Sequence, residues 1–185
     1  MEVRERIRSL QEKMKEEKID YYLIPTADYH NSEYVNEFFK VRQYFSGFTG
    51  SNGSLVISRS QAGLWTDGRY FIQAEKELSG SGITLFRMQE EGVPTIEEYL
   101  AQNMKEGETL GFDGRVVTAS YGKKLEKALK EKHVVIRYEK DVAGSLWKDR
   151  PLMPDNPVSV LPESVCGLRT AQKLEQVREL SLIHI

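Results

Sequence analysis

The sequence predicts an α/β fold with a mixed, mainly parallel sheet that contains a β-hairpin and is covered by helices. Helical and strand-like periods alternate along most of the 185 residues, as in a sheet whose strands are joined through helices. Two short apolar runs, 55–58 and 62–65, stand between glycine-rich turns and predict the hairpin. With 39% hydrophobic residues, the chain is long enough to bury one good core.

The first half of the chain predicts two helices on either side of one strand. Apolar residues at helical spacing predict an amphipathic helix over residues 2–18. Its buried face is expected to consist of Val3, Ile7, Leu10 and Met14. Residues 19–24 predict a strand that stops at Pro25, because proline has no N–H for a ladder. A second helix is expected over residues 33–40, with Asn31 or Ser32 as its cap. Its apolar face would comprise Tyr34, Val35, Phe38 and Phe39.

The alternation continues in the second half. A helix over residues 69–78 is ended by the glycines that follow it, and residues 83–88 form the next strand. Pro94 is expected in the first turn of a further helix. The buried face of that helix would comprise Ile96, Tyr99 and Leu100. A strand over 109–112, a helix over 119–131 and a strand over 133–138 complete the predicted domain.

Composition and charge exclude several classes of protein. A formal net charge of −2 and an isoelectric point near 6.0 provide no basic surface for nucleic acid. No window approaches the ~18 apolar residues of a membrane-spanning helix, so we expect no membrane partner. The single cysteine, Cys166, cannot form an internal disulfide, and Met1 leads into a charged segment without the apolar core of a signal peptide. We therefore expect a cytoplasmic protein.

Prolines mark the end of the first domain, which we place at residues 1–150. Residues 151–169 are interpreted as a proline-rich linker, since proline favours extended backbone and opposes a regular helix. Residues 170–185 restart a helical pattern, with Thr170 as its cap and one apolar stripe that a single helix cannot bury. The stripe consists of Leu174, Val177 and Leu180. We expect this helix to open a second domain that is truncated here, and we interpret the apolar tail, 180–185, as a sequencing-adapter artefact.

Four segments carry a resemblance to a known family. They are YFSGFTGSNG (44–53), WTDGRYFIQA (65–74), GFDG (111–114) and LWKDRP (146–151). In this order they resemble the N-terminal domain of the Xaa-Pro aminopeptidases (aminopeptidase P) of the creatinase/prolidase superfamily. The resemblance covers the chain to about residue 157 and implies a creatinase N-terminal fold with a ribonuclease H-like motif. The linker and the helix after it resemble the entry into the second domain of three-domain members.

The resemblance implies a hydrolase whose catalytic domain is absent from this chain. Family members release the N-terminal residue from peptides with proline at the second position, and two divalent metal ions, Mn²⁺ or Zn²⁺, generate the attacking hydroxide. Their Asp, Asp, His, Glu and Glu ligands match nothing here, so we expect no catalytic residue, no metal ligand and no activity of the chain alone. His30, His133 and His184 are too widely spaced to indicate a site. A homodimer is implied for the parent enzyme.

The candidate site residues follow the two glycine-rich turns. Gly47, Gly50 and Gly53 are expected to permit positive φ in a tight bend. The corresponding loop of the superfamily lies near the catalytic mouth of a dimer, so the resemblance implies that Phe48, Ser51 and Asn52 shape a substrate pocket.

The turn after the second apolar run supplies two more candidates, Arg69 and Tyr70. Arg69 would reach the carboxylate of a peptide, or across a subunit boundary, through its planar guanidinium. The competing interpretation makes Asp67 a helix N-cap and Arg69 an ion-pair partner at the surface or between domains.

Three functions stay open at this point. The first is the non-catalytic domain of an Xaa-Pro aminopeptidase that supports dimerisation and substrate selection. The second is a stand-alone binding or interaction module without peptidase activity. The third is the N-terminal domain of a prolidase or a creatinase-like hydrolase, which the proline-rich linker disfavours. An open reading frame that continues into Asp, His and Glu motifs would distinguish the first from the second.

Overall fold

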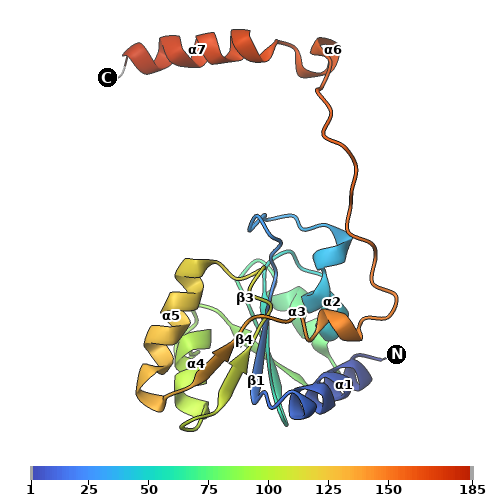
Figure 1. Ribbon diagram of the computed structural model, residues 1–185, viewed down its shortest axis with the longest axis vertical. Helices are drawn as coiled ribbons and strands as arrows, with labels where there is room; N and C mark the ends of the chain where they lie inside the picture. Colours follow the sequence, from blue (N-terminus) through green and yellow to red (C-terminus); the bar gives the residue numbers. More distant parts are fainter. Residues whose placement is uncertain (1, 184–185) are drawn as a thin grey trace. The chain divides into compact units, whose positions relative to one another are not determined.

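The computed structural model describes residues 2–183, and six strands form one sheet in the order β4-β3-β2-β1-β5-β6 (Figure 1). The strands are β1 (Tyr21–Pro25), β2 (Ser54–Ser58), β3 (Ala62–Thr66), β4 (Ile83–Arg87), β5 (Thr109–Gly111) and β6 (Val135–Arg137). The β1–β5, β5–β6 and β3–β4 pairs are parallel, whereas β2 runs antiparallel to β1 and β3. Five strands therefore point the same way. The predicted mixed, mainly parallel sheet with a hairpin is confirmed.

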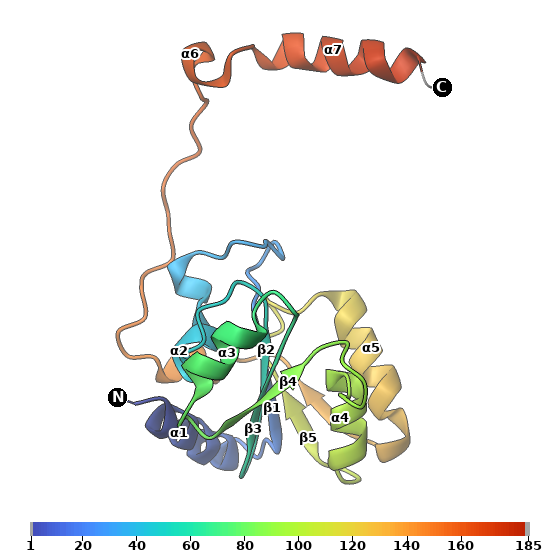
Figure 2. The same cartoon turned by 180° about the vertical axis from the view of Figure 1, so that it is seen from behind.

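Helices cover both faces of this sheet (Figures 1 and 2). The first face carries α1 (Val3–Glu16), α2 (Val41–Ser46) and α3 (Phe71–Leu78). The second face carries α4 (Ile96–Asn103) and α5 (Ala119–Leu129). Two apolar clusters lie beneath them, one containing Leu10, Met14 and Phe45 and the other Leu100 and Leu125. Each cluster joins one set of helices to one face of the sheet.

The strands supply side chains to both clusters in alternation. In β1, Tyr22 and Ile24 belong to the cluster under α1, α2 and α3, while Leu23 belongs to the other. In β3, Leu64 and Trp65 divide in the same way. Successive residues of a strand point to opposite faces, so a slip of one residue would exchange the two sets. Burial on both faces therefore fixes the register of the central strands.

A glycine makes room for the largest side chain of the core. The Trp65 indole stacks on Phe86 with 4.0 Å between ring centroids and 2° between the planes, and its N–H donates to the Pro94 carbonyl at 2.8 Å. A Cβ at Gly63 would lie 2.7 Å from the Phe86 ring and 2.9 Å from the Trp65 ring. Glycine is therefore required by the close approach of two aromatic rings.

The cap of α4 corrects the predicted place of a proline. Thr95 is the N-cap, since its hydroxyl accepts a hydrogen bond from Glu98 N at 3.2 Å and the Glu98 carboxylate accepts one from Thr95 N at 2.8 Å. Pro94 precedes this cap and is not in the first turn. Its carbonyl instead binds the indole of the core tryptophan.

Two strand boundaries also differ from the predictions. Pro25 is the last residue of β1 and lies opposite Ser54, and the next N–H, from Thr26, continues toward the Gly53 carbonyl at 2.9 Å. His133 does not start a strand: the 3₁₀ helix η2 (Lys130–Lys132) ends there at a φ of 50°, and β6 begins at Val135.

The helix predicted over residues 33–40 is wrong. Residues 31–36 contain no helix, and the 3₁₀ helix η1 (Glu37–Phe39) leads instead into α2. Tyr34 is 80% exposed, although the prediction placed it on a buried face, whereas Phe39 is 9% exposed.

Short polar side chains explain this difference. The side-chain oxygen Oδ1 of Asn36 accepts a hydrogen bond from Phe38 N at 3.1 Å, which starts the helical turn after residue 36. Upstream, one oxygen of the Asp28 carboxylate accepts hydrogen bonds from the backbone N–H groups of His30 and Ser32, both at 2.9 Å. These bonds hold the segment in a turn that competes with a helix.

The chain divides into two compact units, Met1–Met153 and Pro154–Ile185. The 3₁₀ helix η3 (Gly144–Leu146) is the last element of the first unit, and the second contains α6 (Glu163–Cys166) and α7 (Thr170–Ile183). The short helix α6 falls inside the segment interpreted as a linker, and Thr170 is the first residue of α7 and not its cap.

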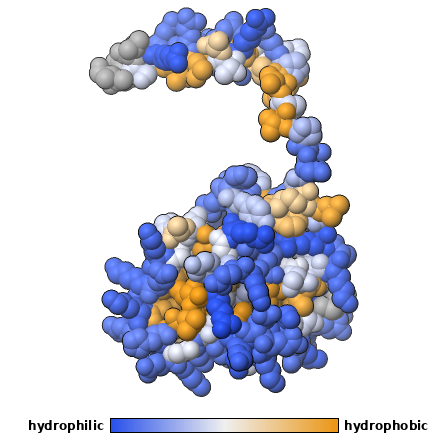
Figure 3. Space-filling model, in the orientation of Figure 1, coloured by the Kyte–Doolittle hydropathy of each residue, from blue (hydrophilic) through white to orange (hydrophobic). Residues whose placement is uncertain are grey.

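Apolar side chains lie at the surface of the second unit (Figure 3). The predicted stripe of α7, Leu174, Val177 and Leu180, is 47%, 61% and 61% exposed. His184 and the last residue of the apolar tail lie outside the described residues. Among residues 2–183 we find no helix with the length and apolarity that a membrane span requires.

These differences in burial predict different rates of backbone hydrogen exchange. In the 185-residue chain, the amides of β2 and β3 should exchange slowly, because both strands are hydrogen-bonded on two sides within the core. The amides of α7 should exchange fast, since an isolated helix of about a dozen residues is marginal in water. Hydrogen-exchange mass spectrometry measures both segments at once. Equal protection of α7 and the hairpin would contradict this expectation.

Candidate functional site

The predicted site residues meet at one edge of the sheet. This is the edge at which β1 and β3 end and the antiparallel strand β2 begins. Residues 47–53, here called the glycine loop, lead into β2, and residues 67–70 follow β3. The Thr66 hydroxyl donates to the Asn52 carbonyl at 2.6 Å, which joins the end of β3 to the glycine loop. In α/β sheets, the carboxyl ends of parallel strands are the usual place for ligand sites.

Side chains connect the same two segments. The hydroxyl groups of Ser51 and Tyr70 share a hydrogen bond of 2.7 Å. The Asn52 amide donates to the Asp67 carboxylate at 2.5 Å. Four residues from two loops therefore form one connected polar surface, and three of them are among the predicted site residues.

Arg69 is held by the aspartate two residues before it. Its Nε and one terminal nitrogen donate to the two oxygens of the Asp67 carboxylate at 3.0 and 2.9 Å. The backbone N–H of Arg69 donates to the same carboxylate at 3.0 Å. The hydrogen bond from the Arg69 side chain, assisted by that from Asn52, holds the pKa of the Asp67 carboxyl well below its usual range. The Arg69 side chain is 61% exposed, so one edge of its guanidinium faces solvent.

This arrangement changes the competing interpretation of Asp67. The N-cap of α3 is Tyr70, with no side-chain hydrogen bond, so Asp67 is not the helix cap. The Asp67 carboxylate instead closes a turn onto Arg69, the residue two positions later. The ion pair expected of Arg69 therefore forms within this turn.

Phe48 lies beneath the glycine loop. Its ring is fully buried and contacts Tyr70 edge to face, with 5.9 Å between centroids. A Cβ at Gly50 would collide with the Phe48 ring and lie 2.8 Å from the Tyr70 ring. Among the three loop glycines only Gly47 has positive φ, at 73°, as predicted. Gly50 and Gly53 do not adopt positive φ, and glycine is needed there because neighbouring atoms lie close to the Cβ position.

Sequence reasoning missed Arg42, which is the centre of this region. Arg42 is only 3% exposed. Its guanidinium donates to the carbonyl oxygens of Phe48 and Gly50 and, at 3.0 Å, to the Thr26 hydroxyl. Burial lowers the pKa of Arg42 to about 10. The only sequence signal was the position of Arg42 between Val41 and the aromatic residues that follow it. The predicted helix ended at residue 40, so Arg42 was not placed in α2.

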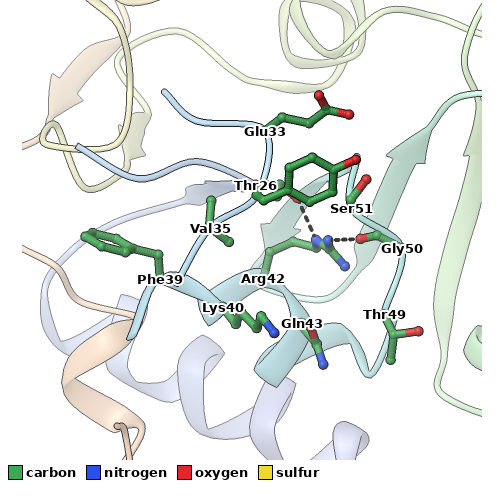
Figure 4. Close-up of a pocket in the computed structure, with 11 residues that line it drawn as sticks. Thr26, Glu33, Val35, Phe39, Lys40, Arg42, Gln43, Thr49, Gly50 and Ser51 are labelled. Carbon is green, nitrogen blue, oxygen red and sulfur yellow. Dashed lines mark hydrogen bonds between the residues drawn. The ribbon is translucent and has the colours of Figure 1, made fainter. Parts of the chain in front are cut away.

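A cavity of about 300 Å³ opens beside the glycine loop (Figure 4). Arg42 lies at its centre, with dashed contacts to Thr26 and Gly50, and Ser51 borders it from the loop. Further labelled residues come from the segment before η1 (Glu33, Val35), from η1 and the residue after it (Phe39, Lys40), from α2 (Gln43) and from the glycine loop (Thr49). A second cavity of about 450 Å³ includes Asn52 in its lining. Neighbouring loop residues thus border two different cavities.

The described residues at this edge supply hydrogen-bonding groups and no cluster of metal ligands. Among residues 2–183, no group of three or more His, Cys, Asp or Glu side chains is placed to hold a metal ion. His30 and His133 are both exposed, and they lie on segments outside the glycine loop. The residues present therefore do not fit the binuclear metal centre that the resemblance implies for the catalytic domain. The groups at this edge are hydrogen-bond donors and acceptors, which can bind a polar ligand.

The comparison with protein families agrees with the fold. The family model described as the Creatinase/Prolidase N-terminal domain matches residues 6–141. The chain belongs to this family.

Known relatives define the family more narrowly. The chain is 39% identical to the "Probable Xaa-Pro aminopeptidase P" of Talaromyces marneffei over 95% of its own length and 27% of the relative. It is also 39% identical to "Aminopeptidase P2" of Arabidopsis thaliana over 86% of its length and 23% of the relative. The chain thus spans about a quarter of the length of these curated relatives.

Solved structures give the same result. The X-prolyl aminopeptidase of Caenorhabditis elegans, described as a cytosolic enzyme with a di-nuclear active site, matches with a TM-score of 0.83 and 31% identity. The match covers 97% of this chain and 31% of that one. The N-terminal domain of the cytoplasmic peptidase PepQ of Mycobacterium tuberculosis matches less closely, with a TM-score of 0.53 and 28% identity over 76% of this chain and 96% of that one.

The packing of Gly50 predicts a specific loss of stability. Gly50→Ala should lower the free energy of unfolding by about 1–3 kcal/mol, because its methyl group has to displace the buried Phe48 ring. Gly122→Ala is the matched control. It lies in α5 with no heavy atom within 4 Å of the added Cβ, and it should stabilise by up to about 1 kcal/mol through helix propensity. Urea denaturation measures both, and wild-type stability of Gly50→Ala would refute the packing argument.

The lowered pKa of Asp67 predicts how stability depends on pH. Because its folded pKa lies below the unfolded value, the ionised carboxylate stabilises the fold above the ordinary carboxyl range, and this is lost as pH falls through the folded pKa. Asp67→Asn should therefore cost about 1 kcal/mol at pH 7, and the difference from wild type should shrink below about pH 4.

Melting temperatures of the two proteins from pH 2.5 to 7 measure this difference. The control is Asp155→Asn, at an exposed position of the second unit, which should match wild type throughout. A stability difference that grows on acidification would show that Asp67 is not stabilised as a carboxylate.

Proposed function

We propose that this chain is the non-catalytic N-terminal domain of a metal-dependent aminopeptidase that releases N-terminal residues from Xaa-Pro peptides. The observation that carries this proposal is the 39% identity to a probable Xaa-Pro aminopeptidase over 95% of the chain. The close structural match to an X-prolyl aminopeptidase supports the same activity. Similarity to the N-terminal domain of the M. tuberculosis peptidase PepQ is weaker, with a TM-score of 0.53.

The metal chemistry belongs to the rest of this enzyme. The C. elegans relative has a di-nuclear active site, and the chain matches 31% of that protein. We place two divalent ions, Mn²⁺ or Zn²⁺, in the catalytic domain, where they would polarise the scissile carbonyl and supply hydroxide. The described residues of this chain offer no ligand cluster for them.

The role of the chain is substrate selection at the edge of the sheet. Ser51 and Asn52 offer side-chain groups from the glycine loop, and Arg69 presents the free edge of its guanidinium. A planar guanidinium suits the carboxylate or carbonyl oxygen of a peptide. Phe48 supports the loop from the core, and Tyr70 fixes it through Ser51. In a cytoplasmic homodimer, this edge would face the peptide as it enters the catalytic pocket.

The same groups are unsuited to bond breaking. A serine nucleophile requires a base such as histidine within hydrogen-bond reach, and the partner of the Ser51 hydroxyl is the Tyr70 hydroxyl. The Asp67 carboxylate is occupied by Arg69 and Asn52. We therefore expect the side chains at this edge to affect substrate binding, measured as KM, and not the bond-breaking step.

Kinetics of the full-length enzyme test this proposal. The enzyme should cleave a peptide with proline at the second position and spare the alanine analogue. Arg69→Ala should retain both metal ions and raise KM about tenfold with little change in kcat, as expected for the loss of a hydrogen bond to a charged group.

The chain offers a matched control for this substitution. Arg115 follows β5 in the same Asp-Gly-Arg turn, binds the Asp113 carboxylate through Nε and a terminal nitrogen at 2.9 Å each, and is 55% exposed. Arg115→Ala should leave KM unchanged, because Arg115 has no contact with the glycine loop in the hydrogen bonds described. Equal KM effects of both variants, or a loss of stability in Arg69→Ala with unchanged kinetics, would refute a substrate role for Arg69.

A further inference from the structure

Within residues 2–183, every hydrogen-bond acceptor of the buried Arg42 guanidinium is an uncharged oxygen atom. Its acceptors are the carbonyl oxygens of Phe48 and Gly50 and the hydroxyl of Thr26. Glu77 acts on it through space, which partly opposes the cost of burying the charge. A buried charge is costly, and a core position is usually filled more favourably by an apolar side chain. The stability of the core alone therefore does not account for an arginine here.

The geometry of this arginine matches the glycine loop. One terminal nitrogen donates to the Phe48 carbonyl and the other to the Gly50 carbonyl, so both carbonyl groups point toward the buried guanidinium. The guanidinium also lies over the Phe48 ring, 4.9 Å from its centroid. The planar fork presents two separate terminal nitrogens to the two carbonyl oxygens in a fixed geometry, whereas a lysine would have to reach both from a single nitrogen atom.

Other contacts hold the two ends of the loop. The Thr26 hydroxyl, which accepts from Arg42, donates to the Gly53 carbonyl at 2.8 Å. The backbone N–H and the hydroxyl of Thr49 donate to the Glu77 carboxylate, both at 2.7 Å. Between these anchors, Ser51 and Asn52 turn their side chains toward the turn that follows β3.

We propose that Arg42 is the positioning residue of the glycine loop, fixing Ser51 and Asn52 in the positions in which they meet the peptide. This inference rests on the proposed function of the loop in substrate selection. Arg42 itself touches no substrate: it acts through the two carbonyl groups it binds. Its removal should leave the metal centre intact and allow the loop to occupy other conformations, of which only a fraction binds the peptide. Apparent affinity falls by that fraction.

The experiment uses the full-length enzyme with Arg42→Met, which keeps an apolar stem against Phe48 and removes every donor. KM should rise about tenfold or more while kcat changes less than about threefold and metal content stays constant. Arg42→Lys should not restore KM, because it keeps the charge and lacks the fork. The control is Leu125→Ala, a fully buried substitution in the other core cluster, which should lower the melting temperature and leave KM unchanged.

A second variant covers the case in which Arg42→Met does not fold. Thr26→Val removes one acceptor of Arg42 and the hydroxyl bond to Gly53 while keeping the shape of the side chain, and it should raise KM in the same direction.

Chemical rescue adds a readout that a structural role would not move. Guanidinium ion added at about 10 mM, far below denaturing concentrations, should enter the site of Arg42→Ala through the adjacent 300 Å³ cavity and lower the KM of this variant again. Sodium chloride at the same concentration should not lower it.

The outcomes separate this inference from the proposed function. If Arg69→Ala raises KM and Arg42→Met does not, Arg42 is a core residue and the inference is wrong. If Arg69→Ala, Arg42→Met and Thr26→Val all leave KM unchanged, substrate selection by this edge is wrong as well. A KM increase in Leu125→Ala equal to that in Arg42→Met would assign the effect to lost stability.

Discussion

The direction of β2 is the constraint on which the rest of this structure depends. Because β2 runs back between β1 and β3, the loop that precedes it lies at the edge where its neighbours end. The glycine loop and the turn after β3 are thereby brought within hydrogen-bond distance, although the β2–β3 hairpin separates them in the chain. A purely parallel sheet would place a loop before a strand at the opposite edge from a loop after one. The hairpin is thus the reason that a site can form here.

The sequence predicted the sheet and most helices because their signals are periodic. Burial on both faces of the strands and the apolar stripe of α1 follow from the spacing of apolar residues in the sequence, and the structure buries residues with that spacing. The segment before α2 could not be predicted in this way, since single hydrogen bonds from Asp28 and Asn36 to nearby backbone decide its path. Arg42 was missed for a related reason. A charged residue is expected at the surface when only the sequence is known, and the carbonyl groups that Arg42 binds are visible only in the tertiary structure.

The candidate site was predicted as a list of residues, and the structure gives them different roles. Ser51, Asn52 and Arg69 have side chains at the edge of the sheet, whereas Phe48 is part of the core and Tyr70 links the two. The chain belongs to the Creatinase/Prolidase N-terminal domain family and spans about a quarter of the length of the two relatives compared. In the function proposed above, such a domain would contribute to specificity by presenting groups to a peptide that is cleaved elsewhere in the enzyme.

The turn formed by Asp67 and Arg69 carries its own counterion, and this has a consequence for the enzyme as a whole. The carboxylate stays ionised well into acid because Arg69 donates to it, and the guanidinium is charged at any physiological pH. The pair is therefore electrically neutral and constant, while its exposed edge still offers directed N–H groups. Under the proposed function, a peptide would therefore meet directed N–H groups of a pair whose own charge state does not change near neutral pH. The contribution of this pair to binding would then be constant over that pH range.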